Sequence, residues 1–573
     1  MKKILVMILT VAMLLGASAA LVSCGAPEDK GAQISVYLGE EIYDFDPTEY
    51  YADSNADALM SLVFEPLFSV SADGKLECAA AKRYEINTEK REILVELKES
   101  YWSDGKRVVA DDFIYAWSKL VLEPNNANPA AALFYDIENA LAVKNGEASI
   151  YDLGVTKTDV YEITIKYREG ADTDRLLKNL AATATAPLRE DIVSSAPTYW
   201  SKSSSTAVFN GPFKVSYLNY EQGVITVSRN EGYHQKITST DYTKYVTPEL
   251  LNATFNVNGS DVAISYSDLE SKTVFYMADA TLADRKANKD SATTSDDLSV
   301  YSYVFNTANP LFAIKEVRQA LSLAIDRNAI VEAITFGKAA SGFVPDMVSG
   351  FRSEVLIAGE AKNNVANGLL ADVDFTGIDK SFTITVNDDP ESVAVAELVK
   401  ASWEALSAGF TVTIEKLGTI ESTVSESTFE DSALQVLLNE AAVGEADFDV
   451  IALDWQLYSV DPFVALSAFS TPYSGMGKDF RTGESRTNLS GWKNAQYDYL
   501  MNTAYKTTDA ATRLNALREA EKILVDEAPI VPIIFNQNFS FASSDISGVA
   551  TDAFGNFVYD RMSLANYKEY LKD

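Results

Sequence analysis

Histidine and cysteine are almost absent from this chain, which has one histidine (His234) and two cysteines (Cys24 and Cys78) among 573 residues. A Ser-His-Asp triad would have to use His234, and neither an HExxH motif nor a Cys/His zinc cluster can be assembled. Motifs of the forms GxSxG and GxxxxGK[ST] are also missing, which disfavours a serine lipase and a nucleotide hydrolase. The sequence therefore excludes most familiar classes of enzyme.

Basic residues are scarce as well, with 48 lysines and arginines against 82 aspartates and glutamates and a formal net charge of −34. Polyphosphate and anionic lipid headgroups repel such a chain, so no nucleic-acid partner is expected. Apolar residues make up 47% of the sequence and charged residues 23%, which is typical of a folded protein. At roughly 150 residues per domain, the length predicts three or four domains with a core large enough to need no disulfide.

A long uncharged run, residues 4–22, follows two lysines at the N-terminus. Its strongly apolar part is short and ends in small residues, which is the pattern of a secretory signal peptide. Leu21-Val22-Ser23-Cys24 resembles the lipobox of bacterial lipoproteins, in which cleavage precedes the cysteine and its thiol is acylated. We predict a signal peptide over 1–23 and a tether over 24–31 lipidated at Cys24; the alternative is a plain signal anchor with an incidental cysteine.

Strands and helices alternate along the rest of the chain, which predicts an α/β fold. Period-two alternation predicts strands over 93–97 and 161–167. Asp389-Pro390 supplies an N-cap and a first-turn proline for a helix that lies between strand-like segments at 382–386 and 410–414, a βαβ pattern. A helix is also predicted from Asp509 to just before Pro529, followed by a strand over 530–535.

Several short motifs occur in a fixed order between about residue 35 and residue 536. Among them are Asp44-Phe45-Asp46-Pro47, Tyr101-Trp102-Ser103-Asp104-Gly105-Lys106, Asn210-Gly211-Pro212-Phe213, Val317-Arg318-Gln319-Ala320-Leu321 and Gly491-Trp492-Lys493-Asn494. The ordered set resembles the family 5 extracytoplasmic solute-binding proteins of ABC importers, the oligopeptide- and dipeptide-binding lipoproteins. The Trp-Ser-Asp-Gly motif by itself is interpreted as a strand end and turn.

The resemblance implies a periplasmic-binding-protein-like α/β fold, in which two lobes joined by a hinge close over a ligand, together with an extra small α/β domain. It divides the chain into lobe I (31–67, 200–300 and 525–573), the extra domain (68–199) and lobe II (300–524). Within lobe II, the Ser-, Thr- and Glu-rich segment 418–447 is predicted to be a surface insertion with one short helix around 433–438.

A tryptophan followed three residues later by an aspartate marks the ligand cleft of this family, where the aspartate pairs with the α-ammonium of a peptide. Here Trp455 is kept, and Tyr458 stands in the place of that aspartate. A tyrosine offers a hydroxyl and a π face but no charge at pH 7. Asp454 would point to the opposite side of a strand from Trp455. The segment therefore leaves the class of solute open, with Trp455, Tyr458, Gln456 and Asp454 as candidate ligand contacts.

The same resemblance places further candidate ligand contacts at Tyr50, Tyr51, Asp53, Tyr301 and Tyr303. Aromatic walls suit a binder that tolerates many peptide sequences, and filling of the core is an equally good interpretation for each of these residues. No catalytic residue, metal ligand or cofactor is predicted. His234 is predicted to have a structural role at an exposed strand end.

The resemblance and the scarcity of histidine and cysteine together predict an extracytoplasmic receptor, anchored to the bacterial membrane only by lipidated Cys24. It would bind a solute, most simply a short peptide, between its lobes and deliver it to the permease subunits of an ABC importer. We expect a monomer without enzymatic activity. The alternatives are the same fold binding a non-peptide solute, such as a glycoside, a metal complex or an opine-like compound, and a secreted acid-catalysed hydrolase, for which no carboxylate pair is singled out.

Overall fold

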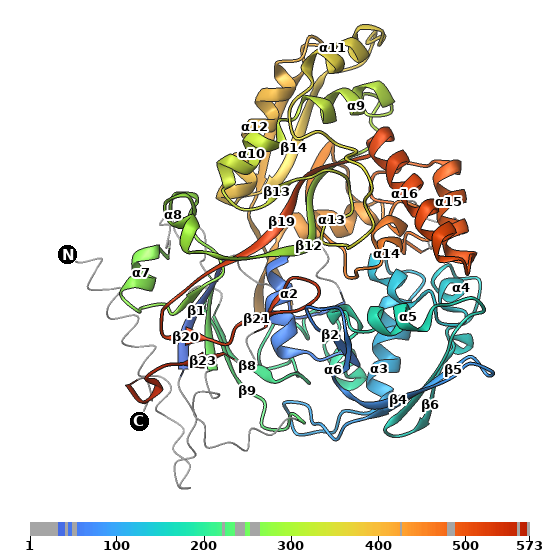
Figure 1. Ribbon diagram of the computed structural model, residues 1–573, viewed down its shortest axis with the longest axis vertical. Coiled ribbons are helices and arrows are strands. Elements are labelled where there is room, and N and C mark those ends of the chain that lie inside the picture. Colours follow the sequence, from blue (N-terminus) through green and yellow to red (C-terminus); the bar gives the residue numbers. More distant parts are fainter. Residues whose placement is uncertain are drawn as a thin grey trace.

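The computed structural model describes residues 33–39, 44–48, 54–219, 224–234, 247–252, 264–424, 427–477, 488–558 and 562–569. Within these residues, eleven strands form one sheet in the order β15-β14-β18-β12-β19-β11-β1-β10-β9-β8, with β13 attached to β19. We call the β15-to-β18 end of this sheet and its helices lobe II, and the β11-to-β8 end and its helices lobe I (Figure 1). Residues 68–199 carry a separate four-stranded sheet and are called the extra domain.

Lobe II is built around a βαβ unit that matches the prediction from the sequence. Strands β14 (Ser381–Asn387) and β15 (Thr411–Leu417) run parallel, and helix α12 (Pro390–Glu404) connects them. The helix begins where Asp389 accepts a hydrogen bond from the backbone N–H of Ser392 at 2.8 Å, with Pro390 as the first helical residue. The other elements of this lobe are α9 (Lys315–Ala324), α10 (Arg327–Ile334), β13 (Lys338–Ala339), α11 (Asn363–Ala371), β18 (Val450–Gln456), α14 (Pro462–Ser467), α15 (Ala495–Lys506) and α16 (Ala510–Glu527).

Two strands of thirteen residues each, β12 (Thr293–Phe305) and β19 (Ile530–Ala542), run through both lobes (Figure 1). They pair antiparallel, and their register is irregular between Asp296 and Val300. On one side of this irregularity β19 pairs with β11 of lobe I, and on the other side β12 pairs with β18 of lobe II. The two strands are therefore the hinge by which one lobe can turn relative to the other.

Lobe I completes the sheet with parallel pairing of β1 to both of its neighbours, β10 and β11. Its strands and helices are β1 (Gln33–Gly39), α2 (Ser54–Val63), β8 (Phe213–Asn219), β9 (Val224–Arg229), β10 (Thr247–Asn252), α7 (Tyr266–Glu270), β11 (Tyr276–Met277), α8 (Leu282–Asn288) and the short C-terminal strands β20 (Ile546–Ser547), β21 (Ala550–Thr551), β22 (Phe557–Val558) and β23 (Ser563–Leu564).

The extra domain has the antiparallel sheet β4-β5-β7-β6, in which the two predicted strands are β5 (Glu92–Leu97) and β7 (Glu162–Lys166). The Trp-Ser-Asp-Gly motif is a turn, as expected, and the buried Trp102 donates its indole N–H to Asp112 at 2.9 Å. The remaining elements are β2 (Phe68–Val70), β3 (Leu76–Cys78), β4 (Ala81–Asn87), α3 (Ala110–Tyr115) with a π-helical continuation over Ala116–Val121, α4 (Ala140–Lys144), β6 (Val155–Asp159), α5 (Thr173–Asn179) and α6 (Glu190–Ser195).

The segment 418–447 is more ordered than the sequence predicted. It forms the hairpin β16 (Thr419–Val424) and β17 (Ser427–Ser432), followed by helix α13 (Ala433–Ala442). Leu434 and Leu438, four residues apart on one face of α13, are buried in the largest hydrophobic cluster. The polar composition of the segment did not predict this packing, because only two leucines are needed to dock a short helix.

Neither a membrane-spanning helix nor a metal site occurs among the described residues. None of their helices is both long enough and apolar enough to cross a bilayer. None of their His, Cys, Asp and Glu side chains gather in groups of three or more that could hold a metal ion. Cys78, the cysteine in the described part of the chain, is free.

Candidate ligand-binding site

The three parts of the chain meet in one continuous hydrophobic cluster. Phe64 of lobe I, Trp117 of the extra domain and Trp455 of lobe II all belong to this cluster and are buried. Lobe II also contacts the extra domain directly, for example between the Ser459 hydroxyl and Asn179 at 2.6 Å, and we call this arrangement the closed form. We call the surface along which lobe II meets lobe I and the extra domain the seam.

Strand β18 places Trp455 on the seam side of the sheet. Trp455 pairs in register with Val300 of β12, while its neighbour Asp454 pairs with Tyr301. Because successive side chains of a strand point to opposite faces, Trp455 and Asp454 face opposite ways, as the sequence predicted. The indole of Trp455 packs against two aromatic rings, Phe469 at 5.5 Å and Phe343 at 6.3 Å between centroids.

Tyr458 follows the end of β18 in a backbone conformation that is unusual for tyrosine. Its φ is +60°, in the left-handed region, and its side chain is only 5% exposed. The loop around it is fixed on both sides: the N–H of Leu457 donates to the carbonyl of Leu298, and Asp461 caps helix α14 by accepting from the N–H of Phe463 at 3.2 Å. A strained conformation held by its surroundings is a feature of functional sites, and Tyr458 belongs to the same hydrophobic cluster as Trp455.

Asp454 is engaged on the far face of the sheet. The side-chain amide of Asn536 donates both to Asp454 and to the hydroxyl of Ser299, the latter at 2.8 Å. The Ser299 hydroxyl in turn donates to Asp297 at 2.6 Å. Asp454 is thus part of a polar network between the hinge strands and lies away from Trp455. Gln456, on the same face as Asp454, is also buried.

Tyr301 and Tyr303 share that far face, toward the helices of lobe II. Their rings lie 5.9 Å apart, and Tyr303 lies 6.0 Å from Trp403 of α12. Burial raises the pKa of both phenols well above the ordinary value. Burial also raises the pKa of the nearby Asp389 to about 6. The structure therefore groups Trp455 with Tyr458, and groups Asp454 with the two tyrosines on the other side of the sheet.

The other predicted residues divide into two groups. Cys24, Tyr50, Tyr51 and Asp53 lie outside the described residues. His234 is not at an exposed strand end, which corrects the prediction: its ring is buried, with Nε2 2.7 Å from Oε2 of Glu65. Glu65 lies 169 residues earlier in the chain, so no local pattern could have indicated this pair.

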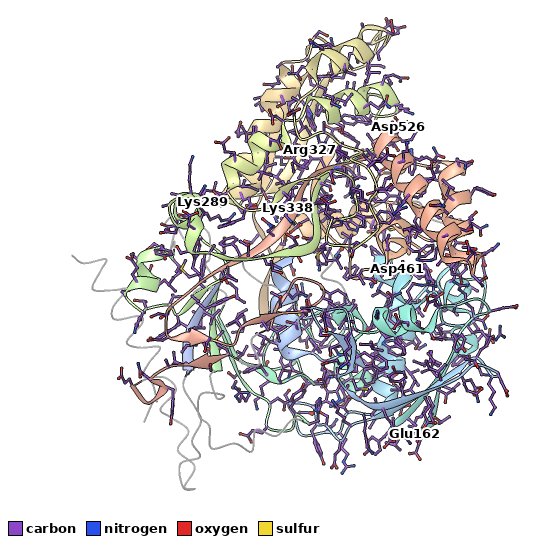
Figure 2. All side chains as sticks on the ribbon, in the orientation of Figure 1. Glu162, Lys289, Arg327, Lys338, Asp461 and Asp526 are labelled. Atoms are coloured by element: carbon purple, nitrogen blue, oxygen red, sulfur yellow. The ribbon has the colours of Figure 1, made fainter. Side chains whose placement is uncertain are left out.

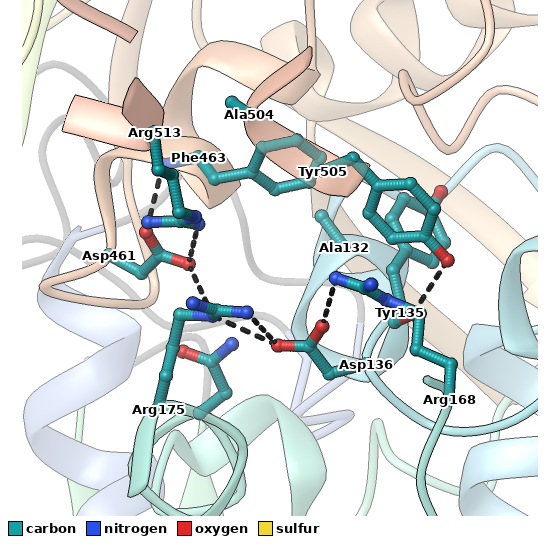
Figure 3. A pocket seen from close by; sticks show the side chains of 11 residues that line it. Ala132, Tyr135, Asp136, Arg168, Arg175, Asp461, Phe463, Ala504, Tyr505 and Arg513 are labelled. Atoms are coloured by element: carbon teal, nitrogen blue, oxygen red, sulfur yellow. Dashed lines mark hydrogen bonds and ion pairs between the residues drawn. The ribbon is translucent and has the colours of Figure 1, made fainter. Parts of the chain in front are cut away.

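A small polar pocket lies where the extra domain meets lobe II (Figure 3). Two aspartates and three arginines line it together with the rings of tyrosines and a phenylalanine. Asp461, which follows Tyr458 by three residues, sits at this boundary near the middle of the molecule (Figure 2). The charged residues of the pocket are Asp136, Arg168, Arg175, Asp461 and Arg513. No spacing within one segment of the sequence indicates this group, because its charged residues come from both the extra domain and lobe II.

Comparisons with known proteins agree with this architecture. The model of the family "Bacterial extracellular solute-binding proteins, family 5 Middle" matches residues 75–477. The chain is 26% identical to the dipeptide-binding protein DppE of Bacillus subtilis over 94% of this chain and 96% of that protein. It is 25% identical to the probable deoxycholate-binding periplasmic protein YgiS of Escherichia coli, over 90% of both chains.

Solved structures show the same fold. Haemophilus influenzae OppA in complex with RPPGFSPFR superimposes with a TM-score of 0.75 at 21% identity, covering 94% of this chain and 100% of that one. The murein tripeptide-binding protein MppA of Escherichia coli, 22% identical, gives 0.74 over 93% of this chain and 98% of that one. The unliganded open form of MppA gives only 0.55, over 95% and 99%. The two-lobed α/β fold predicted from the sequence is thus confirmed.

The family match covers well over half of the chain, and it includes the extra domain and the Trp455–Tyr458 segment. The chain belongs to the bacterial extracellular solute-binding proteins of family 5, and it is a binding protein rather than an enzyme.

Proposed function

We propose that this chain is the receptor of a bacterial ABC importer, which closes its two lobes over a short peptide and delivers it to the permease. The observation that carries the proposal is the burial of Trp455 and of the strained Tyr458 in the seam, in a chain whose relatives include a dipeptide-binding protein. The proposal includes the domain division: lobe I at 31–67, 200–300 and 525–573, the extra domain at 68–199, and lobe II at 300–524.

Trp455 and Tyr458 are the proposed walls of the ligand site on the side of lobe II. Tyr50, Tyr51 and Asp53 are the proposed contacts from lobe I, because they follow the Asp-Phe-Asp-Pro motif. Asp454, Gln456, Tyr301 and Tyr303 complete the proposed set from the opposite face of the sheet. Asp454 already accepts a hydrogen bond from Asn536, which disfavours it as a replacement for an amine-binding carboxylate beside Trp455.

The proposed location is the outer face of the bacterial cell membrane, where acylated Cys24 would hold the protein. Two acyl chains suffice for stable anchoring, so no spanning helix is needed. We propose that the protein acts there as a monomer.

The test is binding of peptides by the purified full-length protein. A tryptic digest of casein serves as the probe, because it offers many sequences and lengths at once. After incubation, gel filtration and denaturation, mass spectrometry should find peptides released from this protein and not from a Trp455→Ala variant. Recovery of no peptide from the unmodified protein would refute peptide binding.

A second candidate is a non-peptide solute bound by the same fold. Two observations favour it: an uncharged tyrosine stands at the amine-anchoring position, and one relative is named a probable deoxycholate-binding protein. A mass spectrum of the compound that co-purifies with the protein separates the two candidates, because an amphipathic steroid and a peptide differ in fragmentation.

A further inference from the structure

The extra domain is attached covalently to lobe I and touches lobe II only through non-covalent contacts. The chain enters it from Leu67 and leaves it toward Phe209, residues that pack in the core with Phe64 of lobe I. Lobe II, by contrast, joins lobe I through the hinge strands β12 and β19. When the hinge opens, the contacts between the extra domain and lobe II must separate.

Helix α5 of the extra domain holds the loop that carries Tyr458. Arg175 and Asn179 lie four residues apart, on one face of this helix. Asn179 accepts a hydrogen bond from the hydroxyl of Ser459 at 2.6 Å, and Arg175 Nε lies 3.5 Å from Asp461 Oδ2. Two residues of one helix thus contact both ends of the segment from 459 to 461.

Each aspartate near this contact also has an arginine partner within its own part of the chain. Within the extra domain, Asp136 is paired with Arg168 at 2.6 Å and with Arg175 at 2.6 Å. Within lobe II, Asp461 is paired with Arg513 at 2.8 Å. Opening the lobes therefore leaves neither carboxylate without an arginine (Figure 3).

Closing the lobes adds the contact from Arg175 to Asp461. The two aspartate side chains are only 7% and 6% exposed in the closed form, so solvent and salt screen this ion pair far less than a surface pair. Tyr505 of lobe II adds a further contact across the same boundary, because its hydroxyl donates to the carbonyl of Tyr135 at 3.0 Å. Its ring also lies 4.0 Å from the guanidinium of Arg168.

We propose that Arg175 is an electrostatic clasp on the closed form, and that it sets how slowly a bound solute leaves. The proposal rests on the proposed receptor function and deepens it. The clasp acts on the loop of Tyr458 from outside the proposed ligand site, so it governs release without contacting the solute. Breaking a buried charge pair at an interface acts mainly on the dissociation rate.

The test compares the full-length protein with Arg175→Gln and with the matched control Lys178→Gln. Lys178 lies on the same helix, and its ion pair with Asp174 at 2.9 Å stays within the extra domain. With peptides of a casein digest as the probe, release from Arg175→Gln should be about tenfold faster or more, with an unchanged association rate. The control should match the parent.

A second variant separates the clasp from the stability of the extra domain itself. Asp461→Asn leaves the Arg175–Asp136 pair intact and keeps a good N-cap for α14. It should speed release as Arg175→Gln does, and the double variant should be no faster than the faster single variant, because each single variant already removes the Arg175–Asp461 contact that the two share.

A further measurement needs no solute. The clasp predicts a larger radius of gyration, by small-angle scattering, for solute-free Arg175→Gln than for the parent and Lys178→Gln. Equal radii and equal release rates would overturn the clasp even where peptides bind. Failure of every protein to bind peptide would refute the receptor function instead, and the scattering comparison would still decide on the clasp.

Discussion

Replacing Trp455 by alanine should weaken solute binding far more than its effect on folding alone would explain. The indole is buried, and it packs against the rings of Phe343 and Phe469. Loss of a buried aromatic anchor at an interface costs about 1–3 kcal/mol, which corresponds to roughly five- to 150-fold in the dissociation constant. The assay is calorimetric titration of the variant and the parent with one peptide identified from the casein digest.

Trp403 supplies the matched control, because it is a second buried tryptophan of lobe II that lies far from the seam. It packs against Tyr303 and Phe382, and its indole N–H donates to the carbonyl of Leu321 at 2.8 Å. Trp403→Phe should lower the free energy of unfolding, since a buried acceptor loses its donor, while the affinity for the peptide stays unchanged. Equal affinities of Trp455→Ala and the parent would refute the placement of the site at this tryptophan.

Two further predictions address anchoring and stability. Cys24→Ala should release the protein from the membrane or leave its signal peptide uncleaved, because no other thiol lies at the edge of the signal. Cell fractionation tests this, and a variant that partitions into membranes and is processed like the parent would contradict the lipid anchor. Burial raises the pKa of Asp389 to about 6, above the unfolded value of about 3.9. The folded chain therefore holds a proton that the unfolded chain has lost, and the free energy of unfolding should fall as the pH rises from about 4 to 6. Asp389→Asn preserves the N-cap, and in denaturant titrations the free energy of unfolding of this variant should decrease between pH 4 and 6 by up to about 3 kcal/mol less than that of the parent. The same pH dependence in the variant and the parent would contradict this prediction.

The sequence was most informative where a local pattern decides the structure. Alternation of apolar and polar residues along 93–97 predicted strand β5, and Asp389-Pro390 predicted the start of α12. Both features depend only on neighbouring residues. The strand predicted over 530–535 runs on to residue 542, since its second half pairs with β12 and, at its last two residues, with β11 of lobe I. That pairing is invisible in the local sequence.

The candidate site was predictable only in part for the same reason. The strand register that turns Trp455 and Asp454 to opposite faces follows from the alternation of a strand. The ion pair of Arg175 with Asp461 next to the site joins residues far apart in sequence, and so does the hydrogen bond of His234 with Glu65 in lobe I. Such contacts depend on how the three domains meet, and no spacing within one segment indicates them.

The most direct test of a peptide receptor without a charged amine anchor is titration of the full-length protein with one peptide in two forms, with a free and with an acetylated N-terminus. Loss of the charge partner of a buried carboxylate costs about 3–5 kcal/mol, and Tyr458 offers no such carboxylate. We predict dissociation constants that differ by less than tenfold, and a gain in preference for the free amine in Tyr458→Asp. A preference for the free amine of a hundredfold or more in the unmodified protein would contradict the account and point to another acid, such as Asp53, as the anchor.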